Sequence, residues 1–390
     1  MLVFATACLG LMFIPSDREE LTEIAESTWK YFQTATYSNG ITDDHINFSG
    51  VQPNRTSPTN VAMYLFAVTC AKNMGFISSL EAENRSRTTL KTLLKFERDK
   101  GFFLNWYVTE SGATLLAITD KQAIPKFLSS VDNAWLAAAL IQVKHEYPML
   151  NTEADHFLRD MDFRFFFDQK TNTFRGGYNP STGQYTEFHY GILLSETRLI
   201  NYVSASMKQV DIVHLAQLTR QRRDGVVLSC YGSMFEGMVV SLFLPEIEEC
   251  GKWKEVLKAY AAVNIALTID GVWGTSYSDD ARGFYKEFGI NRSAVFPLPY
   301  EKEGVVTPYA SFLALQTQPE ESMSNIRRLK PHCFTSLGFA GAYRPRTKEV
   351  SNRALTLDQG CIMMSIANYQ EINPSKKSFV GLAKGGFPND

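Results

Sequence analysis

Apolar and polar positions alternate with helical spacing along most of the chain. From Leu21 the expected core-facing residues follow three, four, seven, eight and eleven positions later, ending at Phe32. This spacing defines one face of an amphipathic helix. Ser16 or Asp17 stands where the N-cap of such a helix belongs. We therefore predict a helix that begins near residue 17.

Comparable segments recur to the end of the chain and bring the expected number of helices to about twelve. Pro58 and Pro308 each occupy an expected first helical position, where proline is favoured. The predicted segments are 58–74, 79–97, 130–147, 150–163, 188–206, 210–219, 231–244, 252–267, 305–317, 319–329 and 356–370.

The segments between these helices are long and rich in Gly, Asn, Pro and Tyr. They cover residues 36–56, 98–128, 168–188, 268–304 and 331–355. Residues 173–178 alternate and predict a small hairpin, but strands and helices do not alternate as a parallel sheet would require. Long loops in a compact domain are usually functional. We therefore predict an all-α fold, an (α/α)6 toroid with minor hairpins, whose aromatic-rich loops build a site at one end.

The domain boundaries follow from the same pattern. Residues 17–375 form one expected domain and 376–390 a C-terminal tail. Residues 1–16 begin with an apolar run from Met1 to Ile14 that is too short to span a bilayer. The run has the length of an export signal but lacks its basic start, so it is either a truncated signal or an apolar arm. We expect export, to the periplasm or outside the cell, with a lipid anchor at Cys8 and a cytoplasmic location as open alternatives.

Composition narrows the class of partner. The 390 residues carry 39 basic and 41 acidic side chains, a net charge of −2, which gives no electrostatic reason to bind nucleic acid or an anionic membrane. The six cysteines are scattered and predict buried free thiols, not a disulfide framework or a zinc site. The 27 Phe, 17 Tyr and 5 Trp indicate a large core, a stacking surface for a ligand, or both.

Several common catalytic motifs are absent from the sequence. It contains no GxxxxGK[ST], no HExxH, no GxSxG and no GxGxxG after a strand, and its six histidines are isolated. We therefore expect no metal and no cofactor. Carboxylates beside aromatic and amide side chains remain, and these are the groups with which carbohydrate enzymes stack sugar rings, hold hydroxyls and cleave glycosidic bonds.

Nine short motifs occur in a fixed order from about residue 17 to residue 370. The motifs are Arg55–Asn60, Gly75–Ser78, Gly101–Tyr107, Ser129–Ala137, Tyr190–Leu199, Gly232–Glu236, Gly271–Ser276, Val306–Ala310 and Leu357–Gly360. Together they resemble the glycoamylase-like domain, including its relative inside cyclic β-1,2-glucan synthases, and the β-1,2-glucanases. The resemblance implies an (α/α)6 toroid that acts on glucans, especially β-1,2-linked ones.

The resemblance also implies catalytic residues, with departures. One family carboxylate lies in a Ser-Glu-x-Arg-Leu motif and corresponds to Glu196. The second lies in Trp-Gly-x-Ser-Glu, where this chain has Tyr277, and the family's Asn-Trp-Tyr-Asp has Val108 in its last position. Three interpretations are open. Tyr277 itself takes a catalytic role, as tyrosine nucleophiles do in sialidases, or a nearby acid replaces the lost glutamate. In the third, the protein binds glycan without cleaving it. The nearby acids are Asp279, Asp280 and Glu287.

Other carboxylates have two interpretations each. Glu196 is a nucleophile or general acid, or else a structural helix residue. Glu236 is the sole charge between residues 226 and 245, so it is either an active-site group or a buried acid bonded to arginine or backbone. Asp132 and Asp358 stand near helix starts, where capping is the default interpretation and binding of a sugar hydroxyl is the alternative.

The remaining candidates are substrate-binding groups near these motifs. The aromatic candidates for stacking on sugar rings are Trp106, Tyr107, Trp135, Tyr190 and Trp273. The polar candidates are Arg55, Asn60, Asn105 and Arg198, for which capping or a local ion pair is the alternative. We predict a glycoside hydrolase or transglycosylase that acts on a glucan through a carboxylate pair in the toroid cleft. The alternative is a glycan-binding protein without activity. The expected partner is an oligo- or polysaccharide, and the oligomeric state is left open.

Overall fold

The computed structural model describes residues 16–381, apart from residues 51, 120, 121 and 374. The predicted signal or arm lies outside the described residues except for Ser16, as do the last nine residues of the tail. No helix in the described part of the chain is both long enough and apolar enough to cross a bilayer.

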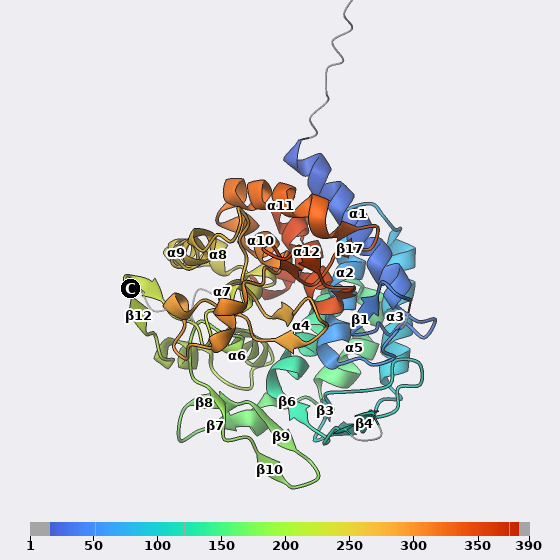
Figure 1. Cartoon of the computed structure of the whole chain (residues 1–390). Helices are drawn as coiled ribbons and strands as arrows, with labels where there is room; N and C mark the ends of the chain where they lie inside the picture. The colour runs from blue at the N-terminus through green and yellow to red at the C-terminus, as the bar shows by residue number, and fades with distance from the viewer. Residues whose placement is uncertain (1–15, 51, 120–121, 374, 382–390) are drawn as a thin grey trace, which may run out of the picture.

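Helices in the described residues alternate along the chain between an outer and an inner ring (Figure 1). The outer elements are α1 (Asp17–Ala35), α3 (Ser79–Leu93), α5 (Asn151–Leu158), the 3-10 helix η3 (Ile212–Gln217), α9 (Trp253–Ala266) and α11 (Pro319–Cys333). The inner elements are α2 (Pro58–Asn73), α4 (Ser130–Glu146), α6 (Thr197–Ser206), α7 (Met234–Met238), α10 (Tyr309–Leu313) and α12 (Thr356–Tyr369). This alternation confirms the predicted (α/α)6 toroid.

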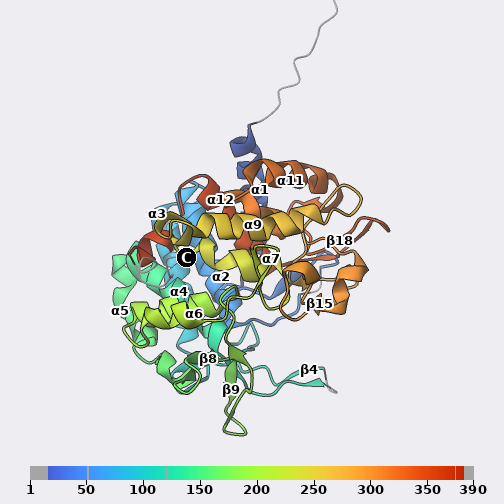
Figure 2. The ribbon, with the colours of Figure 1, turned by 90° about the vertical axis from the view of Figure 1, so that its left-hand side faces the viewer.

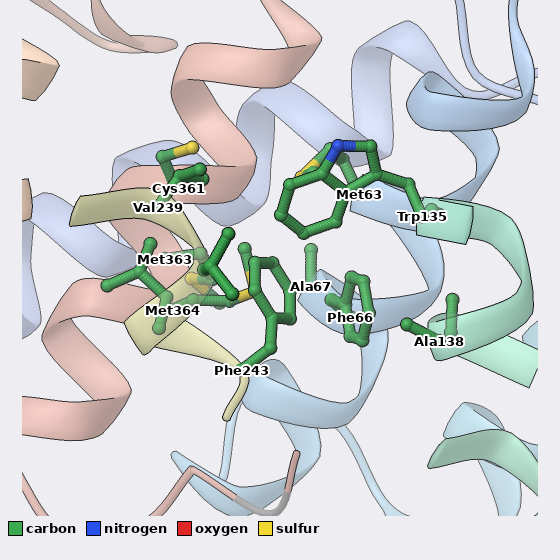
Figure 3. Packing of buried hydrophobic residues seen from close by; sticks show 14 of the residues in the cluster. Met63, Phe66, Ala67, Trp135, Ala138, Val239, Phe243, Cys361, Met363 and Met364 are labelled. Carbon is green, nitrogen blue, oxygen red and sulfur yellow. The ribbon is translucent and has the colours of Figure 1, made fainter. Parts of the chain in front are cut away.

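Burial distinguishes the two rings. Outer helix α1 is buried along the predicted face from Leu21 to Phe32, and Ser16 caps it by accepting from the Glu19 N–H at 3.3 Å. Inner helix α2 has 13 of its 16 residues buried, because helices contact it on every side. Figure 3 shows the core between α2, α4 and α12. The centre of the Phe243 ring lies 4.4 Å from that of Phe66 and 4.6 Å from that of Trp135, to which it packs edge-on.

Loop lengths follow the same alternation. Long connections lead from an outer element into each inner helix: 36–57, 94–129, 159–196, 218–233, 267–308 and 334–355. The return connections 74–78, 147–150, 207–211 and 314–318 are short, whereas 239–252, after α7, is longer. The long loops therefore gather where the inner helices begin, and Figure 2 shows hairpins from three of them, labelled β4, β15 and β18, on one side of the helical body.

Short antiparallel strands order these loops. Strand β1 (His45–Asn47) pairs with β20 (Arg353–Leu355), which joins the loops before α2 and α12. Two three-stranded sheets follow the orders β10-β9-β6 and β11-β8-β7. Their strands are β6 (Leu128–Ser129), β7 (Phe167–Asp168), β8 (Thr173–Arg175), β9 (Gly177–Asn179), β10 (Gln184–Tyr185) and β11 (His189–Tyr190). The hairpin predicted within residues 173–178 is wrong, because β8 and β9 belong to different sheets.

Six two-stranded hairpins complete the strands of the described residues. They pair β2 (Arg98–Asp99) with β3 (Phe102–Phe103), β4 (Ala117–Thr119) with β5 (Gln122–Ala123), β12 (Arg222–Arg223) with β13 (Val226–Val227), β14 (Ser278–Asp279) with β15 (Tyr285–Lys286), β16 (Phe334–Thr335) with β17 (Gly338–Phe339), and β18 (Tyr343–Arg344) with β19 (Glu349–Val350).

Several predicted boundaries differ from the structure. The helix predicted at 188–206 begins only at Thr197, because residues 189–190 pair as β11. The helix predicted at 231–244 divides into α7 and the 3-10 helix η4 (Val239–Leu242), and the short α8 (Glu246–Glu249) was not predicted. The other 3-10 helices are η1 (Pro148–Leu150), η2 (Phe163–Phe166), η5 (Asn291–Ser293), η6 (Pro299–Glu303) and η7 (Ala314–Gln316).

The C-terminal boundary also moves. Residues Ser375–Phe379 form the 3-10 helix η8, the Ser375 hydroxyl donates to Gln142 of α4 at 2.5 Å, and Phe379 is 1% exposed. The tail predicted to begin at residue 376 therefore starts a few residues later. The five described cysteines are free thiols, as predicted, and Cys8 lies outside the described residues.

Candidate active site

The predicted polar residues meet at the beginnings of the inner helices. Asn60, Asp132, Glu236 and Asp358 lie in the first turns of α2, α4, α7 and α12, and Glu196 immediately precedes α6. Backbone N–H groups at a helix start carry a partial positive charge that favours nearby carboxylates. The ring of helix starts therefore gathers acidic side chains from distant parts of the sequence at one end of the toroid.

Glu196 is held by one hydrogen bond and has a strongly perturbed pKa. Its Oε1 accepts from the indole Nε1 of Trp135 at 2.7 Å. Burial raises the pKa of Glu196 to about 8; the indole bond opposes this, and the negative charges of Asp132 and Glu236 add to it. The carboxyl therefore keeps its proton at neutral pH and can donate it.

Trp135 positions this acid and does not offer a stacking face. Its side chain is 1% exposed and packs on Phe243 at the top of the core in Figure 3. The prediction that Trp135 binds a sugar ring is therefore wrong. Because its indole N–H lies against Glu196, the tryptophan couples the packed core to the acid.

Glu236 accepts four hydrogen bonds. Its Oε2 accepts from the Ser229 hydroxyl at 2.6 Å and from the N–H groups of Tyr231 and Ser233 at 2.9 and 3.3 Å. Its Oε1 accepts from the Tyr277 hydroxyl at 2.6 Å. Burial raises the pKa of Glu236, and the bonds from Ser229 and Tyr277 oppose that rise. The sequence analysis considered arginine or backbone as structural partners of Glu236. Backbone N–H groups bond to it here, and no arginine among the described residues does.

Asp132 is a first-turn residue and not the cap of α4. The cap is Ser129, whose hydroxyl oxygen accepts from the Asp132 N–H at 3.2 Å. The Asp132 carboxylate accepts from the Thr59 hydroxyl at 2.5 Å and, in the amide orientation that satisfies both neighbours, from Asn105 at 3.2 Å. The Asn105 oxygen then accepts from the Trp106 indole at 3.3 Å, so a polar chain links half-buried Asp132 to half-buried Trp106.

Asp44, which the sequence analysis missed, lies near the Trp106 end of these hydrogen bonds. Asp44 accepts from Arg55 at 3.0 Å, from Asn60 at 3.1 Å and from His45 at 3.1 Å. Burial acts to raise the pKa of Asp44, but the bonds from His45 and Arg55 hold it well below its usual value. Arg55 also lies 5.4 Å from the centre of the Trp106 ring. The local ion pair considered for Arg55 is therefore present, and it fixes Trp106.

Two tyrosines interact electrostatically with these acids. Burial raises the pKa of Tyr190, and the charges of Glu196 and Asp132 act in the same direction. Tyr285 was not predicted: 47% of it is exposed, yet burial of its hydroxyl raises its pKa, followed by the charges of Asp358 and Glu196.

Three predicted substrate-binding residues belong to the core. Arg198 is fully buried, forms an ion pair with Glu246 at 3.4 Å and donates to the Gly237 carbonyl at 2.9 Å. Tyr107 is fully buried and donates to the Glu97 carbonyl at 2.6 Å. Trp273 is 5% exposed within the main apolar cluster. None of these three can contact a sugar in this structure, so these predictions are wrong.

Two acids near Tyr277 are engaged by partners in the surrounding loops. Asp280 is fully buried and accepts from the N–H groups of Arg282 and Phe284 at 2.9 and 3.0 Å. Burial acts to raise the pKa of Asp280, but these N–H bonds hold it below its usual value. Asp279 is equally buried and pairs with Arg353. Both therefore serve the loop structure, and Glu287 is exposed on the following segment.

Asp358 is also a buried structural acid. It does not cap α12, whose cap position is Leu355, and it accepts from the Ser278 hydroxyl at 2.7 Å. Burial raises the pKa of Asp358 well above its usual value. With 2% of its surface exposed, it has little access to a ligand, and neither role predicted for it is supported.

Two further features lie outside this group. A pocket of about 530 Å³ between α1, α2 and α3 is lined by Tyr37, Tyr64, Asn84, Arg85 and others. It contains none of the predicted site residues. Within the described residues, no group of three or more His, Cys, Asp or Glu side chains could hold a metal ion.

Comparison with known proteins gives sequence matches to parts of the chain. Residues 260–372 match the glycoamylase family, and residues 23–211 match a family described as a protein of unknown function. Over 129 residues, 32% of this chain, the sequence is 33% identical to the cyclic β-(1,2)-glucan synthase NdvB of Rhizobium meliloti. The resemblance to the glycoamylase-like family is confirmed. The matched part of this chain spans only 4% of the length of that synthase.

Solved structures agree on the fold of this chain. An endo-β-1,2-glucanase from Chitinophaga pinensis, in complex with sophorotriose and glucose, superposes with a TM-score of 0.78 at 16% identity, covering 95% of this chain and 97% of that one. A glucoamylase-like protein from Bacteroides caccae gives a TM-score of 0.79 at 18% identity, covering 95% and 98%. The fold is thus the toroid of glucoamylase-like proteins and β-1,2-glucanases.

Proposed function

We propose that the protein is a glycosidase that acts on a glucan, with β-1,2-linked chains as the substrate class, and that Glu196 is its general acid. The observation that carries the proposal is the environment of Glu196: a carboxyl with a pKa of about 8, bonded through one oxygen to Trp135. Its other oxygen has no hydrogen bond to the described residues. A protonated carboxyl with a free oxygen can donate to a glycosidic oxygen.

The neighbours of Glu196 suit a sugar substrate. Trp106 is half-buried and braced by Arg55, so its remaining exposed face can stack on a pyranose ring. Asp132 and Asn105 offer polar atoms beside it for sugar hydroxyls. The linkage is proposed from the match to the cyclic β-(1,2)-glucan synthase and the likeness to an endo-β-1,2-glucanase that was solved with sophorotriose.

The test is cleavage by the purified chain. We expect new reducing ends or transfer products from linear β-1,2-glucan and less from β-1,3- and β-1,4-glucans. Glu196→Gln should abolish this activity, whereas Glu26→Gln on the exposed face of α1 makes the same chemical change far from the site and should not. A folded wild-type protein that leaves every glucan unchanged would refute the proposal.

One observation favours the second candidate, a glycan-binding protein without activity. Tyr277 stands where the resembling family has a glutamate, and Glu236 is occupied by four hydrogen bonds. If Tyr277→Glu creates activity in an inert wild-type protein that still binds β-1,2-glucan, this second function is correct.

A further inference from the structure

The Glu236–Tyr277 pair carries an inference beyond the proposed proton donor. The Tyr277 hydroxyl donates to Glu236 Oε1 at 2.6 Å. Glu236 Oε2 is held by a hydroxyl and two backbone N–H groups, and an N–H can only donate. The Cys230 thiol also interacts with this carboxylate. The carboxylate is thus fixed as an acceptor that faces the phenol.

Tyr277 is fixed as firmly as its partner. Its backbone N–H donates to the Ser233 hydroxyl oxygen at 3.2 Å, and its carbonyl accepts from the Tyr309 hydroxyl at 2.6 Å. The ring packs 5.8 Å from Phe235 and 6.5 Å from Tyr231, and the residue keeps partial exposure. A phenol held on both backbone sides and in its ring can present its oxygen in one direction, as a nucleophile requires.

The pair lies within electrostatic reach of Glu196. Burial raises the pKa of Tyr277, and the charges of Glu236 and Glu196 act in the same direction. Glu236 in turn contributes to the raised pKa of Glu196. Glu196 precedes α6, Glu236 lies in the first turn of α7 and Tyr277 lies in the loop before α10, so all three come from the end of the toroid where the inner helices begin.

We propose that Tyr277 is the nucleophile of a retaining reaction and Glu236 its general base, an inference that rests on the proposed function. In the first step the Tyr277 oxygen attacks the anomeric carbon. The phenol proton passes to Glu236, the glycosidic C–O bond breaks, and Glu196 protonates the leaving oxygen. In the second step water attacks the anomeric carbon and gives its proton to Glu196, while Tyr277 departs and regains its proton from Glu236.

The environment fits concerted proton transfer and excludes a resting phenolate. Burial and two nearby acids disfavour charge on Tyr277, so its proton must leave only as the new bond forms. Burial also raises the pKa of Glu236, which makes it a better base than an exposed glutamate. A tyrosine backed by a base is the nucleophile known from sialidases. A carboxylate in place of Tyr277 would face Glu236 with like charge.

The decisive experiment traps the intermediate. Glu196→Gln is incubated with 2,4-dinitrophenyl β-sophoroside, whose leaving group needs no protonation, so the first step proceeds and the second stalls. We expect a burst of dinitrophenol and a disaccharide adduct on the peptide that contains Tyr277, located by tandem mass spectrometry. An adduct on another residue would overturn the proposal. Failure of wild-type protein to cleave any glucan would instead refute the proposed function.

If no adduct accumulates, the configuration of the released product and a matched pair of variants still test the nucleophile. Wild-type protein should release product with retained configuration, followed by proton NMR, and inversion overturns the proposal. Tyr277→Phe should lower kcat by at least about 10³-fold with folding and glucan binding intact. Tyr343→Phe makes the same change at a tyrosine whose ring stacks on His332, and it should lower kcat little. A Tyr277→Phe enzyme with a tenth or more of wild-type kcat also overturns the proposal.

Discussion

Replacing Glu196 by glutamine should stabilise the protein, and by an amount that grows with pH. A folded-state pKa raised above the ordinary value means that the folded protein resists deprotonation. Above pH 4.5 the unfolded chain loses this proton and the folded chain keeps it, so stability falls as pH rises towards 8. Glutamine is neutral at every pH and its oxygen can still accept from Trp135, so the variant avoids this loss.

The size of the effect follows from the two pKa values. The pKa of Glu196 rises from 4.5 to about 8, and each pKa unit corresponds to about 1.4 kcal/mol. The upper bound on the gain is therefore about 5 kcal/mol, reached near pH 8 and constant above it. Glu196 keeps some contact with solvent, so we expect a gain of about 2–4 kcal/mol, a large part of a typical stability of about 5–15 kcal/mol.

Urea unfolding of wild type and Glu196→Gln at pH 5, 7 and 9 measures this difference without any substrate. The two free energies of unfolding should nearly agree at pH 5 and diverge by pH 9. Glu26→Gln, exposed on α1, is the control and should run parallel to wild type across the range. A difference for Glu196→Gln that stays constant from pH 5 to pH 9 would refute a raised pKa at this residue.

Three other variants separate positioning from binding roles. Trp135→Phe removes the indole bond to Glu196, so the alkaline limb of kcat/KM should move up by about one to two pH units; an unmoved limb would contradict the coupling. Arg198→Met strands buried Glu246 and should lower the unfolding free energy by about 3–5 kcal/mol at unchanged KM; a raised KM at normal stability would restore Arg198 as a substrate ligand. Trp106→Ala should raise the KM for β-1,2-glucan about tenfold with kcat nearly unchanged, and an unchanged KM would exclude stacking there.

The helical architecture was predictable because the spacing of apolar residues follows the face of each helix that is buried. The helix α1 follows its predicted face from Leu21 to Phe32, and most predicted helices lie within a few residues of the observed ones. The prediction failed before Glu196, where an apolar run continues into Leu193 and Leu194 but the backbone pairs and turns. Burial in a loop and burial in a helix leave the same apolar signal over a few residues.

The sequence singled out two acids of the candidate site, Glu196 from a motif and Glu236 from its isolation in an apolar segment. The structure places both at the starts of inner helices, and their catalytic roles stay predictions. Arg198 lies in the motif of Glu196 and Trp273 in the motif that precedes Tyr277, but both pack inward, because nearby residues of one motif point to different sides. Asp44 was missed because it lies eleven residues before its partner Arg55, on the far side of a turn.

Comparison of the buried glutamates favours an enzyme over an inactive binding protein. Glu246 is fully buried and its pKa is raised by burial, but the charge of Arg198 opposes that rise and the pair has a structural role. Glu236 is also buried and Glu196 is half-buried, and both have raised pKa values, yet neither has an ion-pair partner among the described residues. Acids without counter-charges weaken the fold near neutral pH. A chain that only bound glycan could carry glutamine at Glu196 and keep its bond to Trp135, so retention of the costly carboxyl points to a proton that is used.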